Sequence, residues 1–124
     1  MVKQRVFVAV LVLQSRVGDW DDGPIVDHQV RLVEAPDAKS AYARALKLGE
    51  GENSTYKNRD GEPVTWEFLG LSELDLLEQS QLRDGGEVFS WRTRGLGREF
   101  VREKDQLAVF APKSNKTARE LLDE

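Results

Sequence analysis

The feature that most constrains this fold is the apolar run VFVAVLVL within residues 5–14. Successive side chains of a strand point to opposite faces, so a strand with apolar residues at consecutive positions must bury both faces. The run is rich in β-branched residues, which favour strands. The sequence therefore predicts a central strand at 5–14, covered on one face by a helix and on the other by the C-terminal extension or a second subunit.

The same run does not indicate export or membrane insertion. Lys3 and Arg5 precede it, as in a signal peptide, but no small-x-small cleavage site follows. It is also far shorter than the ~20 apolar residues of a membrane-spanning helix. The chain has no Cys, which excludes disulfides, thiolate catalysis and zinc-finger chemistry. We therefore expect a cytoplasmic protein that does not associate with membranes.

A second strand and a helix follow. Residues 25–34 alternate, and one side of this strand carries Val26, His28, Val30 and Leu32. Asp37 is suited to cap a helix, because its carboxylate can accept hydrogen bonds from free N–H groups of the first turn. The helical spacing predicts an apolar face formed by Ala38, Ala41, Tyr42, Ala45 and Leu48. We expect Gly49 to end the helix in a left-handed conformation.

The remaining segments predict more strands and a separate C-terminal extension. We expect strands at 55–58, 64–71 and 87–94, with Val64, Trp66 and Phe68 on one face of the second. Residues 72–82 favour a helical turn or a distorted continuation of that strand. Residues 98–106 are helix-like, 107–111 predict a strand or buried segment, and Ser114 is placed to cap a terminal helix.

These elements predict an α+β fold. It would contain a mainly antiparallel sheet of four to six strands with one principal helix packed on a face. We assign residues 1–94 to this core domain. Residues 95–124 would form an extension, a short helix or strand that acts as a cap or an arm.

Four segments in this order resemble a bacterial family known as domain of unknown function 4288. The segments are VFVAVLVLQS, VRLVEAPDAKSAYARALKLGE, STYKNRDGEPVTWEFLGL and DGGEVFSW, within residues 4–92. The family's motif is Ser-Tyr-x-Asn followed by a strand containing Trp, and Thr55 replaces the Ser here. The resemblance implies a fold and a bacterial source but no mechanism.

The motif also contains the candidate binding residues, which are Tyr56, Lys57, Asn58 and Trp66. Asn58 and Gly61 suit the NRDGE turn, and Tyr56 can stack on Trp66 across neighbouring strands, so a purely structural role explains most of the segment. The alternative is a recognition surface, since polar-tipped aromatics beside an amide and an ammonium are typical of binding sites.

The sequence lacks the residues that metal binding by His and Cys, or catalysis, would need. His28 is the only histidine, so zinc sites of the usual His and Cys type are excluded, and we predict neither a metal site nor catalytic residues. We also expect no cofactor. The net charge is −4, and residues 95–124 are balanced, so the excess negative charge lies in the main body. An acidic body argues against nucleic-acid binding, although the arginines at 83, 92, 94, 98 and 102 leave a local basic patch open.

Two functions remain. The first is a small non-catalytic cytosolic module that binds a protein partner or itself, as a possible homodimer. An immunity-like version would cap a basic toxin or nuclease. The second is an enzyme that binds a small molecule or nucleotide through Tyr56, Lys57, Asn58 and nearby acids.

Overall fold

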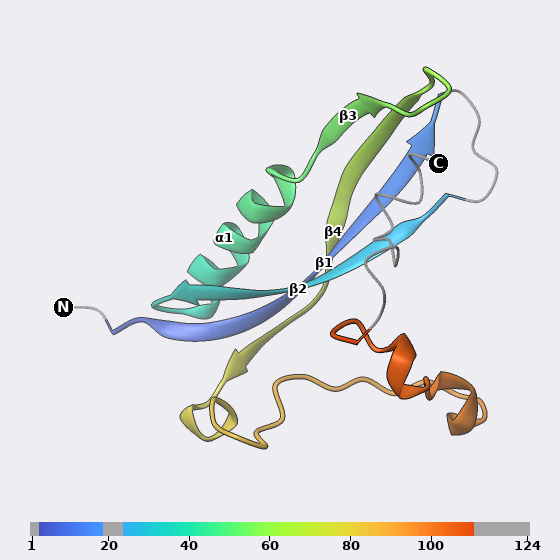
Figure 1. Cartoon of the computed structure of the whole chain (residues 1–124). Coiled ribbons are helices and arrows are strands. Elements are labelled where there is room, and N and C mark those ends of the chain that lie inside the picture. Colours follow the sequence, from blue (N-terminus) through green and yellow to red (C-terminus); the bar gives the residue numbers. More distant parts are fainter. Residues whose placement is uncertain (1–2, 19–23, 111–124) are drawn as a thin grey trace.

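The computed structural model describes residues 3–18 and 24–110 of the chain. In this part, a four-stranded antiparallel sheet carries one α-helix on a single face (Figure 1). The strand order across the sheet is β2-β1-β4-β3. The elements are β1 (Arg5–Val17), β2 (Val26–Ala35), α1 (Ala38–Glu50), β3 (Ser54–Lys57) and β4 (Pro63–Leu77). The predicted α+β class is confirmed, with four strands and one principal helix.

β1 is the central strand that its apolar run predicts. It pairs with β2 on one side and with β4 on the other, both antiparallel. Val8 and Leu11 point to opposite faces, and both are fully buried. Removing apolar side chains from water on both faces makes β1 the centre of the core.

The helix begins where its cap predicts. The backbone N–H of Ser40 donates to the Asp37 carboxylate at 2.8 Å, which satisfies one of the free donors of the first turn. Ala41 and Ala45 are fully buried against the sheet, and their small side chains let the helix lie close to it. Tyr42 and Ala38 differ from the prediction, because both are exposed and do not belong to the buried face of the helix.

Gly49 does not end the helix. The helix continues to Glu50, and Gly49 does not take a left-handed conformation. A methyl group on Gly49 would overlap the ring of Phe68, which lies on β4 directly beneath it. The glycine is therefore explained by the close approach of helix and sheet, and the predicted left-handed stop is wrong.

β4 is longer than predicted and contains two irregularities. Its register with β1 shifts between Val10 and Leu11 and again between Val12 and Leu13, so β4 has an extra residue at each point. The apolar residues of β4 follow the same shifts, with spacings of two, then three, then two: Val64, Trp66, Phe68, Leu71, Leu74 and Leu76. The bulges keep this series on the face covered by α1. Of the two predictions for residues 72–82, a distorted continuation of the strand is confirmed as far as Leu77.

Two predictions for the C-terminal part are wrong. Residues 87–94 form no strand, and residues 107–110 are an exposed turn instead of a strand or buried segment. Residues 89–91 lie over the face of the sheet opposite α1, where they line a hollow with Val10, His28 and Val30 instead of pairing at an edge. The helix-like stretch forms only two 3₁₀ turns, at Gly97–Phe100 and Lys104–Gln106. The helix predicted after Ser114 lies outside the described residues.

No α-helix of the described chain has both the length and the apolar character needed to cross a membrane.

Candidate functional site

The predicted NRDGE turn joins β3 to β4, and Asn58 organises it. The Asn58 side-chain oxygen accepts the backbone N–H groups of Asp60 at 3.0 Å and Glu62 at 2.9 Å. Gly61 has a φ of 77°, a left-handed conformation that glycine adopts without strain. Asn58 and Gly61 are therefore engaged in forming the turn.

The other predicted residues are divided between the two faces of the hairpin. The indole N–H of Trp66 donates to the Tyr56 hydroxyl at 3.4 Å, on the side that faces α1. Trp66 is only 1% exposed and belongs to the core. Lys57 follows Tyr56 in β3 and points to the opposite face, where it is exposed. The structure thus joins Tyr56 to Trp66 and separates both from Lys57; a binding role for the four residues stays a prediction.

A larger exposed surface lies on the face of the sheet opposite α1, which we call the open face. Residues directly opposite each other in neighbouring strands point to the same side. Val10 is opposite Val30 of β2 and Glu73 of β4, and Val8 is opposite Leu32 and Asp75. The open face is therefore formed by Val8, Val10 and Val12 of β1, His28, Val30 and Leu32 of β2, and Glu67, Glu73 and Asp75 of β4. Its exposed part lies on β2 and β4, because Val8 and Val10 of β1 are buried.

The open face changes in character across the sheet. On β2 it is apolar and uncovered, with Val30 55% and Leu32 63% exposed. On β4 it carries a row of three exposed carboxylates, Glu67, Glu73 and Asp75, and β4 contains no Lys or Arg. A row of like charges beside apolar side chains favours contact with a surface that is both basic and apolar.

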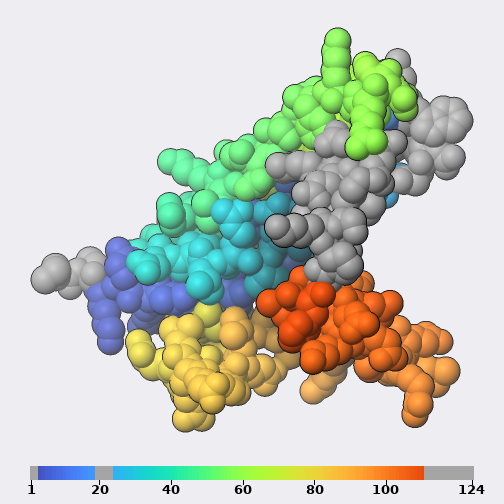
Figure 2. All heavy atoms as spheres, viewed as in Figure 1, coloured from blue at the N-terminus to red at the C-terminus, as the bar shows by residue number. Residues whose placement is uncertain are grey.

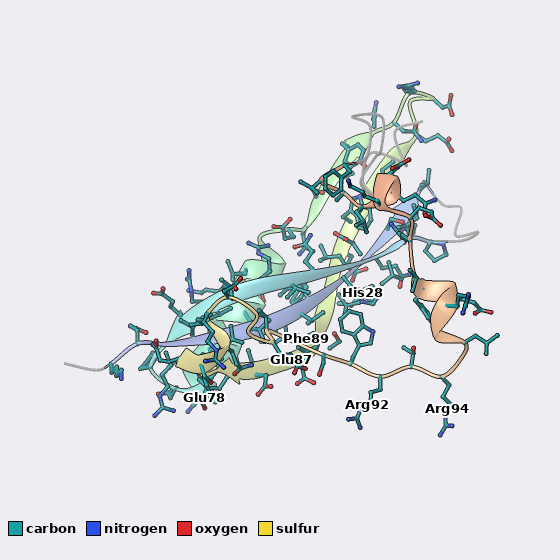
Figure 3. All side chains as sticks on the ribbon, turned by 60° about the horizontal axis from the view of Figure 1, so that its bottom comes forward. His28, Glu78, Glu87, Phe89, Arg92 and Arg94 are labelled. Atoms are coloured by element: carbon teal, nitrogen blue, oxygen red, sulfur yellow. The ribbon has the colours of Figure 1, made fainter. Side chains whose placement is uncertain are left out.

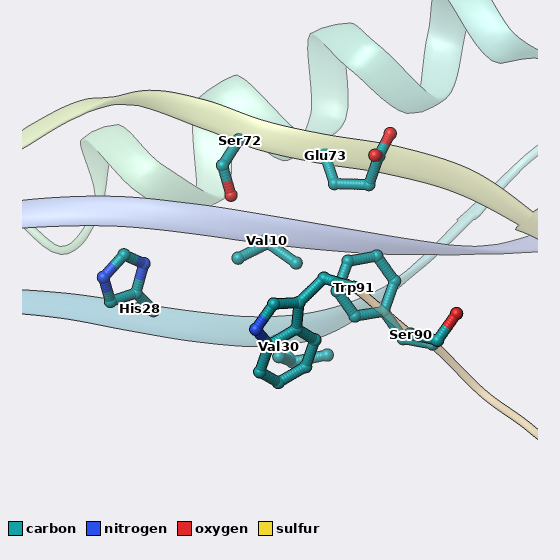
Figure 4. Close-up of a pocket in the computed structure, with 8 residues that line it drawn as sticks. Val10, His28, Val30, Ser72, Glu73, Ser90 and Trp91 are labelled. Atoms are coloured by element: carbon teal, nitrogen blue, oxygen red, sulfur yellow. The ribbon is translucent and has the colours of Figure 1, made fainter. Parts of the chain in front are cut away.

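A hollow lies between these two regions (Figure 4). Its volume is about 630 Å³, and Trp91 is placed over Val30. Phe89 also lines the hollow. The Phe89 and Trp91 rings are 5.7 Å apart. The remaining lining comes from Val10, His28, Ser72, Glu73 and Ser90. His28 lies at its rim and is exposed, as the alternation of β2 predicts.

The chain beyond Trp91 leaves the sheet. Figure 3 shows Phe89 near the strands, while Arg92 and Arg94 extend away from them. All residues from 91 to 110 are exposed, and Figure 2 shows this arm projecting beyond the body. Its apolar side chains include Leu96, Phe100 and Val101, each more than 60% exposed. Residues 87–91 thus reach the open face, and the described part of the arm does not cover it.

The described residues contain no group of three His, Cys, Asp or Glu side chains able to hold a metal ion. Their one salt bridge is between Arg31 and Glu52, at 3.1 Å, on the α1 side of the sheet. The carboxylates of the β4 row therefore form no salt bridge among these residues, although Arg16 lines a small pocket beside Glu67.

Sequence reasoning missed the open face because it concentrated on the hairpin motif. The signal was present in two strands. The apolar side of β2 does not face α1, since the residues that do are Asp27, Gln29, Arg31 and Val33. The three acids of β4 are all odd-numbered, so simple alternation already places Glu67, Glu73 and Asp75 on one side, and the two bulges together preserve this.

Of the comparisons with known proteins, the one with protein families agrees with the resemblance inferred from the motifs. Searches of curated proteins and of solved structures gave no match. The model of the family described as a domain of unknown function, DUF4288, matches residues 6–90, which include all of the sheet except Arg5, the helix and Phe89, but not the arm. Since this match covers more than half of the chain, the protein belongs to the DUF4288 family.

Proposed function

We propose that this protein is a non-catalytic interaction module that binds a basic protein partner on its open face. One observation carries the proposal: the exposed apolar side chains of β2 and the carboxylate row of β4 lie on the same face of one sheet. Contiguous exposed apolar surface rimmed by charge is typical of protein-binding sites.

The charge of the partner follows from the carboxylates. Glu67, Glu73 and Asp75 bring three negative charges to one side of the face. None of them forms a salt bridge among the described residues, although Arg16 lines a small pocket with Glu67. A basic partner would be steered toward this row and held by contacts with Val30 and Leu32. An immunity-like role, in which the module caps a basic toxin or nuclease, is one form of this function.

A charge-reversal experiment tests the proposal. The tagged full chain is used to capture proteins from a lysate, in parallel with the variant Glu73→Lys/Asp75→Lys. The matched control is Glu50→Lys/Asp60→Lys, which makes the same change in net charge at exposed positions away from the open face. Captured proteins are identified by mass spectrometry, and their affinities are then measured with purified components.

We expect basic proteins that are retained by the wild type and the control and lost from the open-face variant. Their capture should weaken at high salt, because ions screen exposed charges. Equal loss from both variants would show a non-specific charge effect and overturn the proposal. Equal retention by both would exclude the open face as the binding surface.

The arm is a competing occupant, because it carries Arg92, Arg94, Arg98 and Arg102. Truncation after Ser90 removes it and leaves the family match intact. If the arm itself occupies the open face, truncation should strengthen capture. If an external partner occupies it, truncation should leave the dependence on Glu73 and Asp75 unchanged.

A further inference from the structure

The two edges of the sheet differ in whether their outward backbone N–H groups are bonded by side chains. β3 pairs with β4 only from Pro63 to Trp66, so the rest of β4 is a free edge. Along this edge the N–H of Phe68 donates to Asn53 at 2.7 Å, that of Leu74 to Glu73 at 3.0 Å, and that of Leu76 to Asp75 at 2.9 Å. Bulges and side-chain caps of this kind block the addition of another strand.

The edge formed by β2 has no such protection. Its ten residues pair with β1 in one unbroken register, from Arg5 opposite Ala35 to Gln14 opposite Val26. The strand contains no Pro, Gly or Lys, and in the described chain it pairs with no strand other than β1. A long, regular and partly apolar edge is a template for another strand.

The backbone groups that point outward can be identified. The N–H of Ser15 donates to the carbonyl of Ile25 at 2.9 Å, so the backbone of Ile25 faces β1. Backbone direction alternates along a strand, and the odd-numbered residues of β2 therefore bond to β1. The outward N–H and C=O groups belong to the even-numbered residues Val26, His28, Val30, Leu32 and Glu34.

This alternation restricts how β2 could pair with itself. In a symmetric pair of β2 strands, the outward backbone groups of one copy must bond to the outward groups of the other, so even-numbered residues lie opposite even-numbered residues. The numbers of two opposite residues then add up to an even number, and the two-fold axis passes through one residue of each strand. An axis at Arg31 would place two arginines opposite each other and is unfavourable. An axis at Val30 places Gln29 opposite Arg31. An axis at Gln29 places Asp27 of each copy opposite Arg31 of the other, which is an attractive pair.

The axis at Gln29 also matches the apolar residues. It sets Val26 opposite Leu32 and His28 opposite Val30, all on the open face. Val26, Val30 and Leu32 are 43%, 55% and 63% exposed in the single chain, and a neighbouring strand would cover part of each. Asp27, Gln29 and Arg31 are already linked along the strand by bonds of 2.9 and 3.1 Å, so their side chains are ordered before pairing.

From this geometry we infer that β2 is a dimerisation edge and that its partner is a second copy of this chain. Two β2 strands pair antiparallel about Gln29, and the two sheets join into one continuous sheet. The two-fold axis is perpendicular to the sheet, so both helices lie on one side and both open faces on the other. The inference does not depend on what binds the open face.

The mass of the full chain in solution, measured by light scattering and sedimentation, tests the pairing. We expect the wild type to have the mass of two 14.0-kDa chains at micromolar concentration. Val30→Pro removes an outward N–H without removing a bond to β1 and should give a folded monomer. The face variant Glu67→Lys, which leaves the caps formed by Glu73 and Asp75 in place, should remain a dimer, which separates this inference from the proposed function.

Exchanging the charges at positions 27 and 31 tests the pairing register of the two β2 strands. This test does not require β2 to tolerate a proline. Asp27→Arg alone places arginines opposite each other, and Arg31→Asp alone places aspartates opposite each other, so each variant should be monomeric. Mixing the two restores both attractive pairs and should give a heterodimer. A monomeric wild type, or single-charge variants that stay dimeric, would overturn the inference. Monomeric single variants that fail to associate when mixed would overturn the Gln29 register, and with it the inference as stated.

Discussion

The face of the sheet that α1 covers is buried, whereas the opposite face is buried only along β1 and is exposed along β2 and β4. On the side of α1, Ala41, Ala45 and Trp66 are at most 1% exposed, and the helix lies close enough that Gly49 touches the ring of Phe68. On the open face, Val30 and Leu32 are more than half exposed. The comparison separates two uses of apolar side chains: one set holds the fold together, and the other is available for contact with a partner. Substitutions on the two faces should therefore have different consequences.

The largest loss of stability is expected from Trp66→Ala. Removing this buried indole leaves a cavity in the core and should lower the free energy of unfolding by about 3–5 kcal/mol. Urea denaturation followed by circular dichroism measures it. Trp91→Ala is the matched control, because Trp91 is 73% exposed beside the open face; it should change stability by less than about 0.5 kcal/mol. If both substitutions lowered the free energy of unfolding equally, the two faces would not differ in their contribution to stability, which would contradict this comparison.

Gly49→Ala tests how closely the helix approaches the sheet. Alanine normally stabilises a helix relative to glycine, by about 1 kcal/mol. Here the added methyl group overlaps the Phe68 ring, so we expect a destabilisation of about 1–3 kcal/mol. In a Phe68→Ala background the overlap is absent, and the same substitution should become stabilising. A stabilising effect in both backgrounds would contradict the packing described here.

The turn between β3 and β4 should contribute less. Asn58→Ala removes the acceptor of two backbone N–H groups and should cost about 1–2 kcal/mol. Asn58→Asp keeps an acceptor oxygen and should retain most of the stability. If Asn58→Ala left thermal stability unchanged but weakened capture of a partner, the motif would act in recognition rather than in the turn.

A smaller and pH-dependent effect is expected at the helix cap. The N–H of Ser40 holds the pKa of Asp37 below its usual value. A lowered pKa means that the ionised cap contributes fully above the unfolded-state pKa, about 3.9. The contribution is lost as the pH falls through the lowered value. Asp37→Asn keeps an acceptor but cannot ionise, so any advantage of the wild type should disappear in acid; an advantage that grows at low pH would contradict this sign.

Much of the closed face could be predicted from the sequence, because local patterns determine it. The apolar run of β1 indicates a central strand, and Asp37 with the alanines at 41 and 45 indicates a helix on a sheet. The prediction that Gly49 ends the helix is wrong, because the ring of Phe68 that lies against it comes from a strand distant in the sequence. The role of this glycine depends on packing and not on the local sequence.

The open face was less predictable. Simple alternation along β4 already places Glu67, Glu73 and Asp75 on one side, but the sequence does not show that this side is the one away from α1. Trp66 was selected as a binding residue for its chemistry. Its burial follows from the strand's orientation relative to α1, which sequence alone leaves open.

The central claim is that the open face binds a partner while the opposite face holds the fold. Carboxylate footprinting by carbodiimide labelling and mass spectrometry tests it most directly, on the full chain alone and in the complex retained from lysate. We predict that labelling of Glu67, Glu73 and Asp75 falls in the complex, while that of Glu50 and Asp60 does not change. Unchanged labelling of the β4 row, or protection confined to Glu50 and Asp60, would contradict the account.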